Sequence, residues 1–214
     1  MNFLSTPQID LFVNQGYVVL ENLVSPDELI SIQQEFDQLL KEGTFKKAQV
    51  TVRSILQSTV HAAVNLAVAA DQDVIRGDWT YWLDDKSPPT LGRIFSSLKS
   101  WQIQLNQNFY CGITNLEAHL AYYPAGPGYQ KHFDQASGKQ QRKISFILYL
   151  NPDWLPKNGG ELVLYAPDSK NILEKIEPQE GRLVMFQSDV FPHEVLPCQS
   201  PRRSLTGWFR SDAL

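Results

Sequence analysis

The sequence of 214 residues is poor in the residues that build disulfide-rich domains and zinc-thiolate sites. Its two cysteines, Cys111 and Cys198, cannot form a disulfide framework or a site with four thiolate ligands. A reducing compartment is the simpler interpretation, and we expect the protein to be cytoplasmic. Histidine is scarce as well, and the four that can serve as imidazole ligands are His61, His119, His132 and His193.

Long apolar runs and an excess of positive charge are also missing. No run reaches the roughly 18 apolar residues that a membrane-spanning helix needs. The start of the chain has no basic region and carries Asp10 inside its first apolar stretch, which argues against a signal peptide. The net charge of −4 and the pI of 5.6 disfavour a protein that binds phosphate backbones. We therefore expect no membrane partner and no nucleic-acid partner, and we expect a monomer.

The residues that are present suit one folded domain. The hydrophobic content of 43% is too high for a disordered chain. In the first half, Ser25 and Glu28 form a capping-box pattern, and apolar spacing with proline and glycine end signals predicts helices. These predicted helices cover residues 6–16, 25–43 and 90–109. Residues 17–23 are typical of a strand, whereas the pattern of residues 44–72 does not distinguish helix from strand.

From residue 113 onwards the sequence changes to short aromatic and β-branched segments divided by glycine and proline turns. Eight strands are predicted, at residues 116–124, 128–134, 142–151, 160–166, 172–178, 182–187, 193–197 and 202–210. Helices followed by strands, without alternation, predict an α+β fold in which the strands form a jelly-roll barrel. Residues 1–112 then supply supporting helices and a substrate loop of the same fold, and residues 113–212 form the catalytic barrel.

Two histidines and one aspartate form a candidate metal site. His132 and Asp134 lie two residues apart, so in a strand both side chains would point to the same face. That pattern is weak by itself, but His193 opens a late strand that could lie beside the first. Two imidazoles and one carboxylate leave three positions open on an octahedral ion, which suits non-haem Fe(II). A zinc hydrolase could use the same ligands but needs only one open position.

The last predicted strand carries a candidate anchor for an acid. Arg202, Ser204, Thr206 and Trp208 share one face of this strand, and Arg203 lies on the other face. A guanidinium with neighbouring hydroxyls can bind a carboxylate through two hydrogen bonds. Because the hydroxyl-bearing residues share the face of Arg202, we expect Arg202 rather than Arg203 to point inward. A solvated pair of arginines on an edge strand is the alternative.

These motifs together resemble the 2-oxoglutarate- and Fe(II)-dependent dioxygenases, and in particular the prolyl hydroxylases of the hypoxia-inducible-factor type and their bacterial relatives. The segments that carry the resemblance are IRGDWTYW, AYYPAGPGYQKHFD, ISFILYLNPDW, NGGELVLY, IEPQEGRLVMFQSD, PHEV and RRSLTGWF. The resemblance spans about residues 74–210 and implies a double-stranded β-helix. It implies Fe(II) held by His132, Asp134 and His193, with 2-oxoglutarate and O₂ as co-substrates and ascorbate as a candidate reductant.

The resemblance also implies a 2-oxoglutarate pocket. The far carboxylate would pair with Arg202, helped by the hydroxyls of Tyr149 and Thr206, and Tyr123 would lie beside the other carboxylate. The residues that match the apolar wall of the pocket are Ile147, Leu162, Val195 and Trp208. This chain departs from its relatives at His119, where they carry an apolar residue. By strand parity His119 shares a face with Glu117 and Ala121, and we expect a pocket-edge or core histidine rather than a fourth iron ligand.

For the substrate, the resemblance implies a proline in a protein. In the related enzymes the segment matching residues 75–82 is a mobile finger whose arginine and aspartate hold the peptide; here these residues are Arg76 and Asp78. Arg142 matches the basic partner of that aspartate. A translation elongation factor is a candidate substrate if the protein is bacterial. Two alternatives stay open: a dioxygenase acting on a small molecule or free amino acid, and a non-catalytic jelly-roll binding module.

Overall fold

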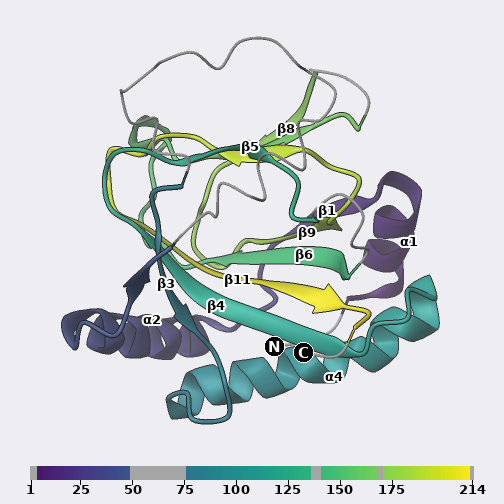
Figure 1. Cartoon of the computed structure of the whole chain (residues 1–214), viewed down its shortest axis with the longest axis horizontal. Coiled ribbons are helices and arrows are strands. Elements are labelled where there is room, and N and C mark those ends of the chain that lie inside the picture. The colour runs from purple at the N-terminus through teal and green to yellow at the C-terminus, as the bar shows by residue number, and fades with distance from the viewer. Residues whose placement is uncertain (1–3, 49–75, 136–140, 168–170, 213–214) are drawn as a thin grey trace, which may run out of the picture.

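A computed structural model describes residues 4–48, 76–135, 141–167 and 171–212. Two antiparallel sheets face each other, and helices cover the outer face of the larger sheet (Figure 1). In spatial order, the seven-stranded sheet contains β1 (Tyr17–Leu20), β9 (Leu183–Gln187), β6 (Arg142–Tyr149), β11 (Arg202–Arg210), β4 (Asn115–Tyr123), β3 (Trp79–Trp82) and β2 (Lys46–Lys47). The four-stranded sheet contains β5 (Tyr129–His132), β10 (His193–Val195), β7 (Leu162–Tyr165) and β8 (Ile172–Ile176).

The predicted α+β jelly roll is confirmed. Each of the eight strands expected after residue 113 is present, from β4 to β11. In the described part of the chain, the only further helix or strand between them is a short 3₁₀ helix at Pro156–Asn158. The first half also contributes β1, β2 and β3 to the larger sheet. Residues on both sides of position 112 contribute strands to one sheet. The division at residue 112 into a supporting part and a catalytic part therefore stays a prediction.

The helices form where the end signals predicted them. They are α1 (Thr6–Gln15), α2 (Pro26–Lys41) and α4 (Pro89–Phe109). Gly16 ends α1 with a φ of 78°, which glycine adopts without steric cost, and the Ser25 hydroxyl accepts a hydrogen bond from the backbone of Glu28 at 3.3 Å. The buried faces of the helices pack with the outer face of the larger sheet into one apolar cluster. This cluster buries the outer face of the larger sheet, and the inner face is available to line a pocket.

The segment at residues 75–82 includes a strand. Trp79–Trp82 is strand β3 of the larger sheet, in register with β4 from Trp79 opposite Tyr122 to Trp82 opposite His119. The mobility over the active site that the resemblance implies for this segment stays a prediction. Ladder hydrogen bonds on one side and β2 on the other hold this segment in the sheet. Of the ambiguous residues 44–72, Lys46–Lys47 form β2, while residues 49–72, including His61, lie outside the described residues.

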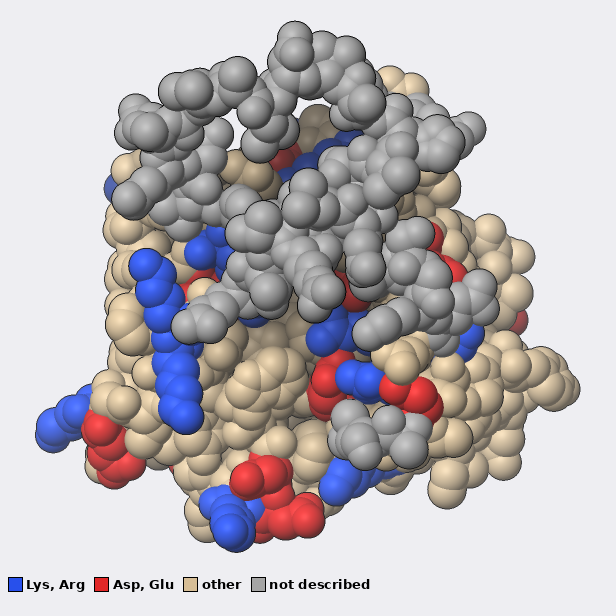
Figure 2. All heavy atoms as spheres, in the orientation of Figure 1, with Lys and Arg blue, Asp and Glu red and all other residues tan. Residues whose placement is uncertain are grey.

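The surface agrees with the mixed composition. On the face seen in Figure 2, lysines and arginines lie beside aspartates and glutamates, and the part not covered by grey atoms has no uniformly basic stripe. Within the described ranges, no helix combines the length and the apolar content needed to cross a membrane.

Gly128 lies where the chain enters β5, and its lack of a side chain permits a close backbone approach. A Cβ atom at this position would lie 1.9 Å from the carbonyl oxygen of Val195, at the end of β10. We expect Gly128→Ala to destabilise the fold by about 3 kcal/mol or more in urea denaturation, because backbone must move to make room. The matched control is Gly92→Ala in α4, where the nearest atom is 3.6 Å away. That substitution should raise stability by up to about 1 kcal/mol, and equal effects of the two changes would contradict the argument.

Candidate active site

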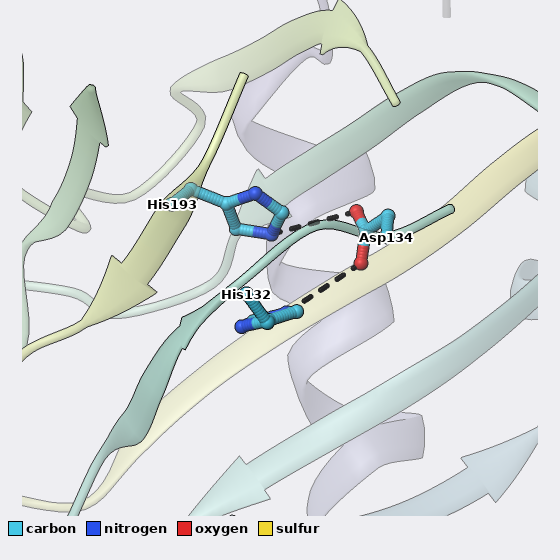
Figure 3. A group of neighbouring side chains, drawn as sticks. All are labelled: His132, Asp134 and His193. Atoms are coloured by element: carbon cyan, nitrogen blue, oxygen red, sulfur yellow. Dashed lines mark ion pairs between the residues drawn. The ribbon is translucent and has the colours of Figure 1, made fainter. Parts of the chain in front are cut away.

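His132, Asp134 and His193 come together between the two sheets. The antiparallel register of β5 and β10 places His132 directly opposite His193. All three side chains point toward one another (Figure 3), and one potential ligand atom from each lies within 4.8 Å of the others. The Nε2 atom of His132 is 3.6 Å from Oδ1 of Asp134, and Nε2 of His193 is 3.5 Å from Oδ2. The residues predicted as metal ligands thus form one group.

Asp134 reaches this group by a different route from the one predicted. Strand β5 ends at His132, so the alternation of side chains along a strand does not extend to Asp134. The carboxylate is held instead by the Ser145 hydroxyl, which donates to Oδ2 at 2.6 Å and lies 2.9 Å from the hydroxyl of Ser188. A bend after the strand and a contact from β6 therefore aim the aspartate.

Both imidazoles are oriented by backbone carbonyls. Nδ1 of His132 lies 2.7 Å from the carbonyl oxygen of Gln130, and Nδ1 of His193 lies 3.1 Å from that of Phe191. Because a carbonyl only accepts, each Nδ1 carries the proton and donates, which leaves both Nε2 atoms as the ones facing Asp134. Metal-binding histidines in proteins are commonly oriented in this way.

The charges of the group favour a bound cation. Burial by itself would raise the pKa of Asp134, but the neighbouring His193 and His132 hold it well below its usual range. Burial and the nearby His193 lower the pKa of His132, whereas Asp134 outweighs burial and raises the pKa of His193. A carboxylate that stays ionised between two imidazoles is a donor set for a divalent ion. The three residues fit Fe(II), since they would occupy one side of an octahedron and leave positions for ligands.

A second group lies further along the inner face of the larger sheet. Arg202 is buried, and its Nε donates to the carbonyl oxygen of Gly160 at 2.9 Å. Its guanidinium lies 5.0 Å from the ring centre of Tyr149 and 5.3 Å from that of Tyr123. Among the described residues, Nη2 of Arg202 and the hydroxyl of Tyr149 have no hydrogen-bond partner. Two unpartnered buried donors, one of them charged, fit the carboxylate of an acid such as 2-oxoglutarate.

The parity of β11 separates the two arginines. Arg202 lines the pocket, whereas Arg203 lies on the opposite face, where its Nη1 is 2.7 Å from Oδ1 of Asp37 and its guanidinium lies over Phe36. The face containing Arg202 continues along the strand through Thr206, whose hydroxyl is 3.2 Å from that of Ser204.

The predicted wall residues lie around the same pocket. The pocket that contains the three candidate ligands and Arg202 is also lined by Tyr123, Ile147, Leu162, Val195, Thr206 and Trp208. Tyr149 contributes from beneath Arg202. Both sheets supply this wall, because β6 and β11 belong to the larger sheet and β7 and β10 to the smaller one.

The predicted substrate residues Arg76, Asp78 and Arg142 all line the pocket, although they do not all pair with one another as expected. Arg76 and Asp78 form a bidentate pair, with Nε to Oδ1 at 2.6 Å and Nη2 to Oδ2 at 2.9 Å, and both line the pocket. The expectation that Arg142 partners Asp78 is wrong for this structure. Arg142 lies 2.7 Å from Glu117, and its guanidinium is 3.7 Å from the ring centre of Trp208. Strand register explains why Arg142 contacts Glu117 and not Asp78. Glu117 of β4 is paired with Trp208 of β11, and β11 is paired with β6, which begins at Arg142.

Comparison with known proteins agrees with this geometry. The sequence profile of the 2OG-Fe(II) oxygenase superfamily matches residues 118–210, the segment that contains all three candidate ligands and Arg202. The chain carries a 2OG-Fe(II) oxygenase domain.

The oxygenase domain is related to prolyl hydroxylases. The chain is 36% identical over 141 residues to Egl nine homolog 1 of Homo sapiens, covering 63% of this chain and 33% of that protein. It is 30% identical over 207 residues to the hypoxia-inducible factor prolyl hydroxylase of Caenorhabditis elegans, covering 91% of this chain and 26% of that protein. The chain thus spans between a quarter and a third of the length of these curated relatives.

Solved structures extend the likeness to most of the chain. A Pseudomonas putida prolyl-4-hydroxylase superposes with a TM-score of 0.79 at 28% identity, covering 97% of this chain and 98% of the other. A prolyl hydroxylase from Trichoplax adhaerens, solved with a peptide fragment of hypoxia inducible factor, gives a TM-score of 0.78 at 25% identity. It covers 95% of this chain and 87% of the other.

Tyr129 is a residue of the site that the sequence did not reveal. The Tyr129 ring stacks on His132 with centroids 3.7 Å apart, and the Arg76 guanidinium lies 5.1 Å from the centre of the same ring. Tyr129 therefore connects a candidate metal ligand to a candidate substrate residue. Its place in the segment GYQKHFD indicated a strand residue near the site, but its stacking partners depend on the tertiary fold.

Proposed function

We propose that the protein is an Fe(II)- and 2-oxoglutarate-dependent dioxygenase that hydroxylates a prolyl residue in a protein substrate and releases succinate and CO₂. The observation that carries the proposal is a single pocket with the three-ligand group at one end and the unpartnered donors of Arg202 and Tyr149 at the other. One end suits a metal and the other suits the far carboxylate of a dicarboxylic acid.

The residues of the chain would divide the work as follows. His132, Asp134 and His193 would hold Fe(II), and Arg202 with Tyr149 would bind the far carboxylate of 2-oxoglutarate. The apolar wall would exclude water from the space between. Bound iron, together with 2-oxoglutarate and O₂, supplies the oxidising chemistry, and the protein orients the reactants. Ascorbate is a candidate reductant that would keep the iron in its Fe(II) state.

A peptide substrate is supported by the relatives and by the charged pair in the pocket wall. The Trichoplax adhaerens relative was solved with a peptide fragment, and the Arg76–Asp78 pair lines the same pocket as the metal group. A translation elongation factor is the candidate protein, presenting a proline in a loop. The monomeric state and the cytoplasmic location rest on the sequence, the latter on the two free cysteines.

The proposed function is tested by mass spectrometry of a cell lysate incubated with the purified protein, Fe(II), 2-oxoglutarate and ascorbate. A peptide that gains one oxygen atom on proline, only when 2-oxoglutarate is supplied, is the expected result. Oxidation of a free amino acid or metabolite instead would support the small-molecule alternative. Absence of succinate under all conditions, with the metal shown to be bound, would favour a non-catalytic binding module.

Asp78→Asn should separate substrate binding from co-substrate turnover. Asp78 is buried and neutralises Arg76, so the amide would leave the guanidinium in the pocket wall without its charged partner. We expect hydroxylation of the peptide to fall about tenfold or more, while succinate release without peptide changes much less. Both rates are measured in the same preparation, and an equal loss in the two would argue against a role in binding substrate.

A further inference from the structure

His119 is a polar residue in the wall of the pocket that the proposed function leaves without a role. It lies on the inner face of the larger sheet, in a row of register partners that runs from Trp82 through His119 and Thr206 to Ile147. Its side chain lines the pocket and is only 1% exposed. A leucine or methionine would fill this position at lower cost, because a buried polar atom needs a partner.

The ring of His119 packs against two indoles. Its centroid lies 4.7 Å from that of Trp82 and 5.5 Å from that of Trp208, whose ring is nearly parallel at 26°. The two indole centroids are themselves 6.4 Å apart, so the three rings form one cluster. Among the described residues, Nδ1 of His119 and Nε1 of Trp208 are both buried without a hydrogen-bond partner. Two neighbouring side chains thus present unsatisfied polar atoms in the wall of one pocket.

The imidazole of His119 is neutral at physiological pH. Burial lowers its pKa to about 3, and the positive charges of Arg76 and Arg142 act in the same direction. A neutral imidazole carries one N–H group, and an indole carries one N–H group and cannot accept. A ligand that only accepts hydrogen bonds can therefore be bound by both residues at once.

His119 does not belong to the metal group. Within the described ranges, the cluster of potential ligand atoms consists of His132, Asp134 and His193 alone. A fourth metal ligand at His119 is therefore not supported, and its free nitrogen needs another partner.

The sheet register places His119 between the two ends of the pocket. The neighbouring row on one side contains Ser145, which bonds Asp134 of the metal group. The neighbouring row on the other side contains Tyr149, which lies beneath Arg202. Same-face rows are about 7 Å apart along a strand, so an acid that extends from Arg202 to the metal group passes His119.

We propose that His119 and Trp208 donate hydrogen bonds to the 2-oxo acid end of bound 2-oxoglutarate, as a positioning pair separate from Arg202 and Tyr149. This inference rests on the proposed function, since it assumes that 2-oxoglutarate binds in this pocket. Its chemistry is that of an acceptor-only anion: the orphaned atoms of His119, Trp208, Tyr149 and Arg202 can all donate.

The test uses ligand binding rather than turnover. The full chain is loaded with Mn(II), which does not drive the reaction, and is titrated with 2-oxoglutarate and with 2-oxobutanoate, a 2-oxo acid that lacks the far carboxylate. The Kd of each ligand is measured by calorimetry and by quenching of tryptophan fluorescence. The variants are His119→Leu, which removes the hydrogen bond, His119→Gln, which keeps a donor, and Arg202→Met.

We expect His119→Leu to weaken both ligands by the same factor, about tenfold or more, with Mn(II) affinity unchanged. His119→Gln should recover most of that loss, and Arg202→Met should weaken 2-oxoglutarate but not 2-oxobutanoate. Without ligand, His119→Leu should melt at the same temperature as the unaltered protein or higher, because it removes an unpartnered buried atom.

Two outcomes would overturn the inference while leaving the proposed function intact. One is 2-oxoglutarate binding by the unaltered protein and by His119→Leu with equal affinity. The other is a loss confined to 2-oxoglutarate, which would place His119 at the far carboxylate. If the unaltered Mn(II)-loaded protein binds no 2-oxoglutarate at all, the proposed function itself fails.

Discussion

Alanine in place of Asp134 or His193 is expected to abolish release of succinate from 2-oxoglutarate. Each change removes one of three donors around the candidate metal position, and Asp134 is the one anionic donor among them. The rate of succinate release should fall by more than about 100-fold, because mutating residues that merely orient metal ligands already costs up to about 100-fold. Succinate is measured with and without peptide, and bound iron is measured on the same samples.

Glu194→Gln is the matched control for these variants. Glu194 is the residue after His193 in β10, and its carboxylate accepts a hydrogen bond from Tyr165 rather than facing the metal group. Removing this negative charge should leave succinate release within about twofold of the unaltered protein, because the Glu194 carboxylate contacts Tyr165 and none of the three candidate ligands. Retained turnover in Asp134→Ala or His193→Ala would refute the assignment of the metal ligands.

Methionine in place of Arg202 is expected to raise the 2-oxoglutarate concentration needed for half-maximal turnover by about 100-fold or more. A hydrogen bond to a charged group contributes about 1.5–3 kcal/mol, and the guanidinium can make two such bonds to a carboxylate. Methionine keeps much of the length and apolar surface of the arginine stem, so the buried position stays filled. Iron binding should persist, since Arg202 is not part of the metal group.

The neighbouring arginine provides the control. Arg203 is half-buried on the opposite face of β11 and pairs with Asp37, whose side chain is 57% exposed. Arg203→Met should therefore change the 2-oxoglutarate requirement little and cost about 1 kcal/mol of stability or less. If Arg203→Met raised the requirement and Arg202→Met did not, the parity of β11 would be assigned incorrectly. If neither variant did, the acid would bind elsewhere.

Local sequence patterns were sufficient for the main elements of the fold. Short aromatic and β-branched segments divided by glycine and proline predicted the strands after residue 113, because strand propensity and turn chemistry are local properties. The side-chain period of two, which is also a property of each strand by itself, distinguished Arg202 from Arg203. Capping residues predicted α2 for an equally local reason, since Ser25 and Glu28 lie within one turn.

Tertiary structure decided how distant residues meet. Asp134 lies beyond the end of its strand, and the contact that aims it comes from Ser145 of β6. The partner of Arg142 is Glu117 rather than Asp78, because the pairing of β4, β11 and β6 sets which charges are neighbours. No local period contains this information, since it depends on the register between strands.

Sequence and tertiary structure each determined part of what the few histidines can do. The sequence by itself determined that His132 and His193 are candidate ligands and that His119 shares a strand face with Glu117 and Ala121. Only the tertiary structure decided that the first two meet opposite each other, while His119 lines the pocket and packs against Trp82 and Trp208 with an unpartnered nitrogen. The physical reason is that residue type and strand parity limit what a side chain can do, whereas strand pairing and packing determine which atoms it can reach.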